Sequence, residues 1–219
     1  LLSLGLGLVG YLMIHKNFEL AKQTQLKNAI VQNNLVQSSV EYELLQLLNS
    51  ASDNSVSQNA DNSETSNNNT DNTGAKKSGV TASSITAQLP QIGGRVSSSV
   101  RSRDSFFYIY FDGEKVYTDD KSDARISDTL FKNLTTGNKN YVIKEESQKH
   151  YIYVTSQSVI DEKNLWIVSK CDASEAYTLL DEQINYFRLI IIVILIAESA
   201  AMYFISSYMT KPLEKHNHV

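Results

Sequence analysis

The residues that could do chemistry in this chain are aromatic, cationic and titratable side chains on a few short segments. The sequence contains no Ser/His/Asp or Cys/His arrangement, no paired catalytic carboxylates, no glycine-rich phosphate loop and no zinc-ligand spacing. It therefore gives no argument for catalysis, and we expect neither a cofactor nor a metal in this part of the protein. The candidates for a ligand pocket are Tyr108, Tyr110, Arg125, His150, Tyr151, Tyr153 and Trp166.

Five of these candidates are aromatic residues that alternate along predicted strands. They either line a pocket between a sheet and a helix or belong to the core, and we expect about half of them in the core because alternation places neighbouring residues on opposite faces. Arg125 would meet an anionic ligand through bidentate hydrogen bonds, whereas most arginines of the chain are expected at the surface. His150 begins a predicted strand and would titrate near neutral pH.

The acidic residues Asp119, Asp120 and Asp123 offer oxygen ligands of the kind that divalent cations prefer. Their spacing follows no known cation-binding loop such as the EF-hand. We therefore expect them in a solvated loop and predict no metal site.

A second set of candidates would relay a signal along the chain. Asp172 and Glu175 form the D-x-x-E pattern of a capping box, which predicts that a helix starts directly after the last strand. No Gly or Pro lies between Ala173 and Thr210, so we expect one nearly continuous helix that transmits a shift of that strand. Pro212 follows just beyond this predicted helix. The relay candidates are Asp172, Glu175, Glu198 and Pro212.

Glu198 is the only charged residue between Leu189 and Tyr208, a run long enough to cross a bilayer core of roughly 30 Å. A charge at mid-bilayer costs about 2.5–3.5 kcal/mol on insertion scales, so the side chain is expected to face protein. Ala197 and Ala201 beside it allow helices to approach closely. We expect a hydrogen bond across a helix bundle or a dimer rather than a proton relay.

The first 14 residues form another run without charge. Because HKNFELAKQ follows instead of a small-residue cleavage site, a truncated first membrane helix is favoured over a signal peptide. Lys211 and Lys215 follow the second span, and this predicts a cytoplasmic C-terminus. The sequence thus predicts a cell-membrane protein with two spans, and an extracytoplasmic region between them.

Between the spans the sequence predicts an α+β domain. A long helix over 15–49 carries an imperfect apolar stripe interrupted by Asn33 and Gln37. It packs either on its own domain or on its copy in a dimer, since both would bury the same face. Residues 50–83 are rich in Asn, Ser and Thr and are expected to be a disordered insert.

The predicted core of the domain is 84–172. Aromatic and β-branched runs around Asp112-Gly113 predict a hairpin, and a helix that stops at Gly137 follows. Three further strands are expected, at 141–145, 150–159 and 164–170. This order predicts a small antiparallel sheet of about five strands with a helix on one face. A juxtamembrane helix (173–188), the second span (189–208) and a cytoplasmic segment (209–219) complete the predicted chain.

Composition excludes some classes of function. The 219 residues carry a net charge of −4 and no basic patch, so we expect no nucleic-acid partner. A single cysteine, Cys171, allows no intrachain disulfide and is expected to act as a small apolar residue at a strand end.

The segments FFYIYFDGEKVYTDD, HYIYVTSQSV and NLWIVSKCDASEAYTLL resemble the extracytoplasmic PAS-like (Cache) sensor domains of bacterial membrane receptors. SYMTKPLEKHN is similar to the start of a HAMP linker. This resemblance implies that Pro212, in the first turn, opens a new cytoplasmic helix beyond the second span. The resemblance implies a homodimer that senses an unknown extracellular small molecule, ion or peptide. It favours a two-component sensor histidine kinase, with a response regulator as partner, over a chemotaxis receptor or nucleotide cyclase. A membrane-anchored envelope binding protein without signalling is the competing class.

Overall fold

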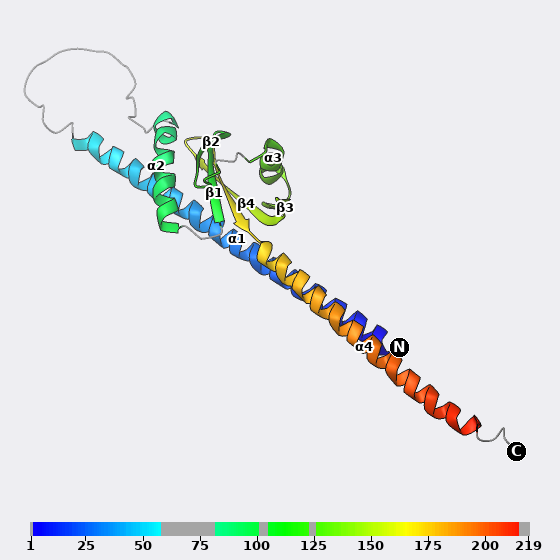
Figure 1. Cartoon of the computed structure of the whole chain (residues 1–219). Coiled ribbons are helices and arrows are strands. Elements are labelled where there is room, and N and C mark those ends of the chain that lie inside the picture. The colour runs from blue at the N-terminus through cyan, green and yellow to red at the C-terminus, as the bar shows by residue number, and fades with distance from the viewer. Residues whose placement is uncertain (1, 58–81, 101–104, 123–125, 215–219) are drawn as a thin grey trace, which may run out of the picture. The chain divides into compact units, whose positions relative to one another are not determined.

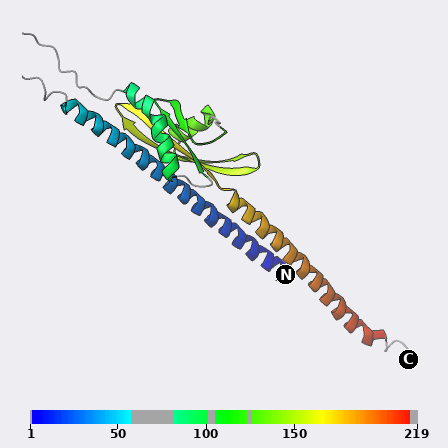
Figure 2. The ribbon, with the colours of Figure 1, turned by 60° about the vertical axis from the view of Figure 1, so that its left-hand side comes forward.

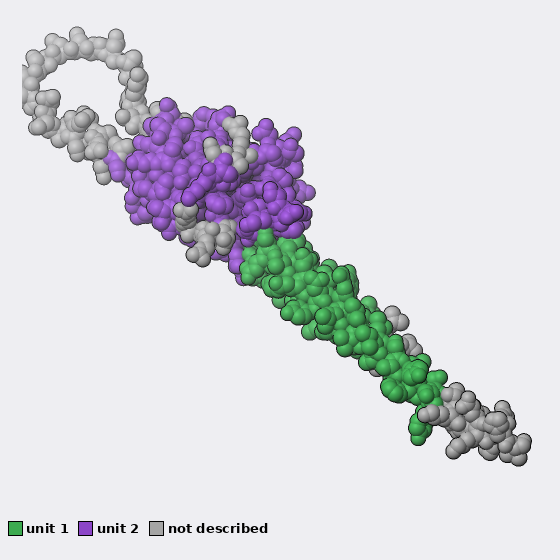
Figure 3. All heavy atoms as spheres, in the orientation of Figure 1, with its two compact units in different colours: residues 1–25, 173–219 green, residues 26–172 purple. Residues whose placement is uncertain are grey.

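The structure is a computed structural model that describes residues 2–57, 82–100, 105–122 and 126–214 (Figure 1). It divides into two compact units, residues 1–25 with 173–219 and residues 26–172, which are coloured separately in Figure 3. Along the described chain the elements are α1 (Leu2–Ser57), α2 (Ala82–Val100), β1 (Ser105–Phe111), β2 (Glu114–Thr118), α3 (Asp128–Thr136), β3 (Tyr141–Glu146), β4 (Lys149–Ile160), β5 (Lys163–Asp172) and α4 (Ser174–Glu214).

The strands of the 26–172 unit form one antiparallel sheet, in the order β2-β1-β5-β4-β3 among the described residues. Together with the long N-terminal helix, this confirms the predicted mixture of helices and a five-stranded antiparallel sheet. The arrangement is compatible with a PAS-like fold. β4 and β5 extend further into their connecting turn than predicted, because the turn itself takes only two residues.

Three tight turns join neighbouring strands. The two central residues of each turn have positive φ: Asp112 and Gly113 between β1 and β2, Ser147 and Gln148 between β3 and β4, and Asp161 and Glu162 between β4 and β5. Positive φ at both positions is the geometry of a type I′ turn, whose twist matches that of the flanking strands. The predicted Asp-Gly hairpin is confirmed, whereas the other two turns place ordinary side chains in left-handed backbone.

One face of the sheet is covered by α1 and α2 (Figure 2). Aliphatic residues dominate this core, because alternate residues of β1 and β5 point the same way and meet the apolar stripes of the two helices. Asn33 and Gln37 interrupt the stripe of α1 for a reason: Asn33 accepts a hydrogen bond from Ser169 Oγ (2.8 Å), and Gln37 donates to Ser158 Oγ (2.8 Å). The buried members of this core are Val36, Val40, Leu44, Ile85, Leu89, Ile92, Val96, Phe107, Ile109, Phe111, Leu165 and Ile167.

The other face of the sheet packs against α3. Ser127 caps this helix by accepting from the backbone N–H of Leu130, and Gly137 follows its last residue as predicted. The core on this side is aromatic as well as aliphatic, with Tyr108, Tyr110, Ile126, Leu130, Leu134, Tyr153 and Val168 buried. α3 is therefore the helix predicted on one face of the sheet, and the other face is covered as well, by α1 and α2.

The additional helix is α2, a segment for which the sequence predicted no element. Its apolar residues Ile85, Leu89, Ile92 and Val96 recur at helical spacing and are buried on the sheet. Burial of this stripe outweighs the low helix propensity of Pro90 and the glycines. Gly93 is required for close packing, because a Cβ at this position would overlap the ring of Tyr117.

The predicted insert 50–83 is helical at both ends. α1 continues to Ser57, and α2 begins at Ala82. The predicted helix 15–49 and the predicted first span are parts of the same α1. Residues 58–81 lie outside the described residues.

The unit of residues 1–25 and 173–219 consists of helix. α4 is continuous from Ser174 to Glu214, as the absence of Gly and Pro predicted up to Thr210, and it runs on through position 212. In the described part of the chain it is the helix that is long and apolar enough to cross a membrane, over Ser174–Met209. Within this unit the ring of Phe187 occupies the space that a Cβ at Gly10 would need, so α1 and α4 approach closely there.

Candidate functional site

The candidate site is a cavity of about 130 Å³ between the sheet and the N-terminal end of α3. Sheet register brings its polar residues together: Tyr153 of β4 pairs with Lys170 of β5 on one side and with Val142 of β3 on the other. Directly paired residues of antiparallel strands point to the same face, here the α3 face. The cavity is lined by Tyr108, Ile126, Ser127, Leu130, Lys144, Glu146, Tyr153 and Lys170.

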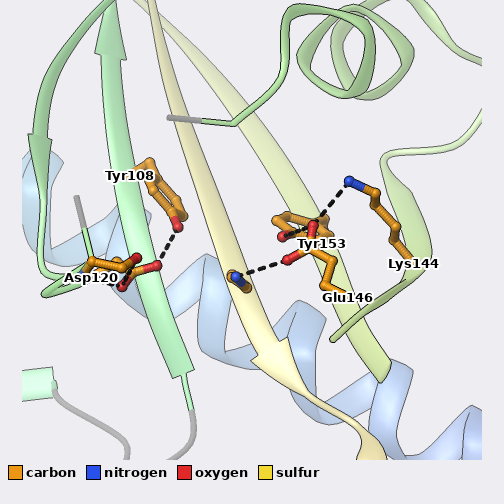
Figure 4. A network of polar contacts seen from close by, with 7 residues as sticks. Tyr108, Asp120, Lys144, Glu146 and Tyr153 are labelled. Atoms are coloured by element: carbon orange, nitrogen blue, oxygen red, sulfur yellow. Dashed lines mark hydrogen bonds and ion pairs between the residues drawn. The ribbon is translucent and has the colours of Figure 1, made fainter. Parts of the chain in front are cut away.

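Glu146 is the centre of a polar network (Figure 4). Its carboxylate accepts hydrogen bonds from Lys144 Nζ (3.0 Å) and Tyr153 OH (2.9 Å), and it forms an ion pair with Lys170 Nζ (3.0 Å). Burial by itself would raise the pKa of Glu146, but the bonds from the two lysines and the tyrosine lower it overall. Burial and the bond to Glu146 raise the pKa of Tyr153, so its hydroxyl stays protonated and donates.

Lys170 is the less exposed of the two lysines that line the cavity. Its side chain is 12% exposed, and the ammonium lies 4.3 Å from the ring centroid of Tyr151 and 5.8 Å from that of Tyr153. Aromatic faces attract cations most strongly where water is excluded. Two tyrosine rings and one carboxylate therefore surround this ammonium group in the wall of the cavity.

A second polar pair lies beside the cavity. Tyr108 OH donates to Asp120 Oδ2 (2.8 Å), and Asp120 Oδ1 accepts from the backbone N–H (3.0 Å) and hydroxyl (2.7 Å) of Ser122 (Figure 4). Burial acts to raise the pKa of Asp120, but these bonds and the charge of Lys170 lower it overall. The pKa of Tyr108 is raised by burial and by Asp120.

These contacts correct the expectation of a solvated acidic loop. Asp120 is buried, and Asp119 accepts from the backbone N–H of Phe107 (2.7 Å) and from Ser97 Oγ (3.2 Å). Both carboxylates hold the end of β2 against neighbouring elements. The described residues contain no group of three His, Cys, Asp or Glu side chains suited to a metal, and Asp123 lies outside them.

The cavity offers two ammonium groups to a small anion. Its lining carries two lysines and one carboxylate, and the carboxylate of Asp120 lies beside it. The hydroxyls of Tyr108 and Tyr153 lie at the same walls and donate to Asp120 and Glu146. Its volume equals that of about four water molecules, which suits a carboxylate or phosphate with few atoms.

The predicted pocket residues divide into four groups. Tyr108 and Tyr153 line the cavity, while Tyr110, Tyr151 and Trp166 belong to the same core cluster. All five aromatic residues thus lie on the α3 face of the sheet. His150 lies on β4 beside Glu145, with 3.9 Å between Nε2 and Oε2, and does not line this cavity. Arg125 lies outside the described residues.

Sequence reasoning missed three charged residues of the site, Lys144, Glu146 and Lys170. Val142, Lys144 and Glu146 are every second residue of β3, so their side chains lie on the same face of the sheet. A strong hairpin signal between β3 and β4 would have placed both next to Tyr151 and Tyr153, but the turn residues Ser147 and Gln148 do not provide one.

The predicted relay residues lie along the chain after the site. Asp172 ends β5 and accepts from Lys149 Nζ (3.2 Å), and Glu175 lies in the first turn of α4. Glu198 is half-buried within α4. Pro212 lies in the last turn of α4, which is continuous through this position, so the expected start of a new helix at Pro212 is wrong for the described residues.

β5 has one further notable side chain, next to its end. Cys171 pairs with Ile152 of β4 and Ser105 of β1 and is partly buried. Burial raises the pKa of its thiol to about 11. The cysteine therefore behaves as the small apolar residue that was predicted.

Comparison of the chain with protein-family models, with curated proteins and with solved structures found no match.

Proposed function

We propose that this chain is the sensory and transmembrane signalling region of a bacterial receptor. In this proposal residues 26–172 form an extracytoplasmic sensor domain, α4 crosses the membrane, and the start of a HAMP linker follows it. The first residues of α1 form the other span, and the close approach of Gly10 and Phe187 supports packing of the two helices as a bundle.

The observation that carries the proposal is the link between cavity and membrane helix. Lys170, which lies in the wall of the cavity, precedes Asp172 by two residues, and α4 begins at Ser174. No glycine or proline interrupts the connection. A change in the bonding of Lys170 therefore has a short covalent path to the helix that crosses the membrane.

The proposed ligand is a small anion, and Glu146 occupies its place in the free protein. A bound carboxylate or phosphate would compete with Glu146 for the ammonium groups of Lys144 and Lys170. Charge-assisted hydrogen bonds of this kind are strong enough to order a ligand and to move a strand. The resulting displacement of β5 is the proposed signal.

Membrane topology is tested by labelling intact cells. The variant Lys132→Cys, in a Cys171→Ser background, places a thiol on an exposed position of α3. A membrane-impermeant maleimide should label it without lysis. Labelling only after lysis, or recovery of the protein without detergent in the soluble fraction, contradicts the proposal.

Ligand binding is tested with the detergent-solubilised chain. Inorganic phosphate and carboxylates of one to five carbons are screened for a rise in Tm, because a ligand that binds the native state stabilises it. At least one should raise Tm in the wild type and not in Lys170→Met, while Lys149→Met serves as a control with a surface lysine. No rise with any of these anions contradicts the anion pocket.

The proposed parent protein is a two-component sensor histidine kinase. The residues encoded after position 219 test this directly, because a kinase requires a dimerisation helix with a phosphoacceptor histidine. Phosphotransfer from the full-length protein to a response regulator should change when the effective anion is added. A parent with a long methyl-accepting coiled coil would instead be a chemotaxis receptor.

A further inference from the structure

α1 has a second apolar face that its own domain does not cover. Within residues 26–172 its buried residues Ala29, Val36, Val40 and Leu44 lie on one side of the helix. At 3.6 residues per turn the opposite side carries another set of large apolar residues. These are Val31 (59% exposed), Leu35 (50%), Tyr42 (61%) and Leu45 (57%).

The exposed residues follow a heptad pattern. Together with Asn28, Ser38 and Asn49, which are also exposed, they recur at alternating intervals of three and four residues. Asn28, Leu35, Tyr42 and Asn49 take the first core position of the heptad, and Val31, Ser38 and Leu45 take the second. Four of these seven positions are apolar, and asparagine at the first core position of a coiled coil helps to fix register at a cost in stability.

The exposed residues of this face are mostly neutral, which favours a partner surface that is also neutral. Between Asn28 and Ser38 every fully exposed residue is neutral. The two acidic residues further along this segment pair with residues of their own domain. Glu41 bonds to Gln37 and Ser158, and Glu43 Oε2 lies 2.8 Å from Arg95 Nη2. An identical surface meets no like charge here, although the chain as a whole is acidic.

The apolar surface widens at the C-terminal end of the seam. Leu45 and Leu48 of α1 line a groove of about 350 Å³ with Val159 and Ile160 of β4. Val159 is 66% exposed. A side chain from a neighbouring helix would be accepted between α1 and β4.

We propose that a second copy of the chain occupies this face and forms a parallel two-stranded coiled coil along residues 28–49 of α1. The parallel arrangement rests on the proposed function: two copies anchored in one membrane are related by an axis normal to it, so their α1 helices point the same way. Stable interfaces bury about 1,200–2,000 Å² in total, and a single short seam lies at the low end. Anchoring in one membrane raises the effective concentration and favours the dimer.

The test is disulfide crosslinking of the full chain in membrane vesicles. Ser38→Cys, in a Cys171→Ser background, changes an exposed seam position without removing an apolar side chain. Facing core positions of a parallel coiled coil come within the Cα separation that a disulfide needs, so oxidation with diamide should give a linked dimer. Lys132→Cys on α3 is the matched control and should stay monomeric. Equal crosslinking of both variants, or none of Ser38→Cys, overturns the proposal.

A charge in the seam provides an independent check. Adding Leu35→Glu to Ser38→Cys should lower the crosslinked fraction about tenfold, because the two copies would face like charges. Leu35→Met should keep it. The domain should stay folded, since the Leu35 side chain is half exposed, and circular dichroism verifies this. Unchanged crosslinking in Leu35→Glu overturns the seam.

Failure of the dimer and failure of the proposed function give different results. Flotation of the same vesicles shows whether the protein is membrane-bound. If it does not float with lipid, the membrane anchoring is wrong, and crosslinking of Ser38→Cys in the soluble fraction still tests the seam. If it floats and Ser38→Cys does not crosslink, the dimer interface alone is wrong.

Discussion

The two faces of the sheet are built from the same strands but differ in chemistry. Towards α1 and α2, β5 contributes Leu165 and Ile167 to an aliphatic core. Towards α3, the same strand contributes Trp166 and Lys170 to an aromatic and charged wall. Strand alternation thus lets one segment serve stability on one side and recognition on the other. Substitutions one residue apart on β5 should therefore have separable effects on stability and on ligand binding.

Truncation on the aliphatic face should have the largest effect on stability. Leu89 is fully buried in α2, and Leu89→Ala should lower the free energy of unfolding by about 2–5 kcal/mol through lost burial and a cavity. Urea unfolding of the solubilised chain, followed by Trp166 fluorescence, measures it. Lys132→Ala, exposed on α3, should stay within about 0.5 kcal/mol of the wild type. Lost anion binding in folded Leu89→Ala would contradict the separation of the two faces.

Substitution on the α3 face should affect binding more than stability. Lys170→Met should weaken binding of an effective anion at least tenfold, about 1.4 kcal/mol, as measured by calorimetry. Glu146 keeps Lys144 and Tyr153 as partners, so the free energy of unfolding should fall less than in Leu89→Ala. A variant that binds as well as the wild type would remove Lys170 from the site.

A substitution in a turn changes neither face and provides a reference. Gln148 has φ of 65°, a backbone conformation that costs a non-glycine residue roughly 1–2 kcal/mol. Gln148→Gly should therefore raise the free energy of unfolding by about 1 kcal/mol without altering anion affinity. Gly113→Ala, at φ 84°, should lower it for the same reason. Opposite signs would show that these turns are not of the type described.

The pH dependence of stability should be the smallest effect and should arise on the α3 face. The pKa values of Asp120 and Glu146 are lowered from 3.8 and 4.5 by folding, so the unfolded chain binds more protons in acid. Their stabilisation is present above those unfolded values and is lost as the pH falls through the lower folded values. Asp120→Asn with Glu146→Gln should flatten the acid limb of Tm against pH. An unchanged limb would indicate that other carboxylates set it.

Local signals made most of the sheet predictable. Asp112-Gly113 predicted the first hairpin because both residues adopt left-handed backbone. Gly137 predicted the end of α3, where its backbone is extended and a Cβ would overlap the carbonyl oxygen of Asn133. α2 was missed because Pro90, Gly93 and Gly94 argue against a helix, and only packing against Tyr117 explains a glycine there. Tertiary burial overrides propensity in this segment.

The site was less predictable than the fold. Tyr108 and Tyr153 were identified as aromatic residues on strands, but Lys144, Glu146 and Lys170 come together only through the register of β3, β4 and β5. Register is a property of paired strands rather than of one segment. The seam on α1 was also hidden, since apolar residues on two opposite sides of a helix give no single stripe.

The thiol of Cys171 provides a chemical measure of strand opening in this protein. Its thiol lies between the lysine of the cavity and the start of α4, and burial raises its pKa to about 11. Thiolate is the reactive species, so alkylation of Cys171 near neutral pH should be slow while the strands stay paired. The alkylation rate of the native protein would then measure how often β5 separates from β1 and β4, with and without a bound anion.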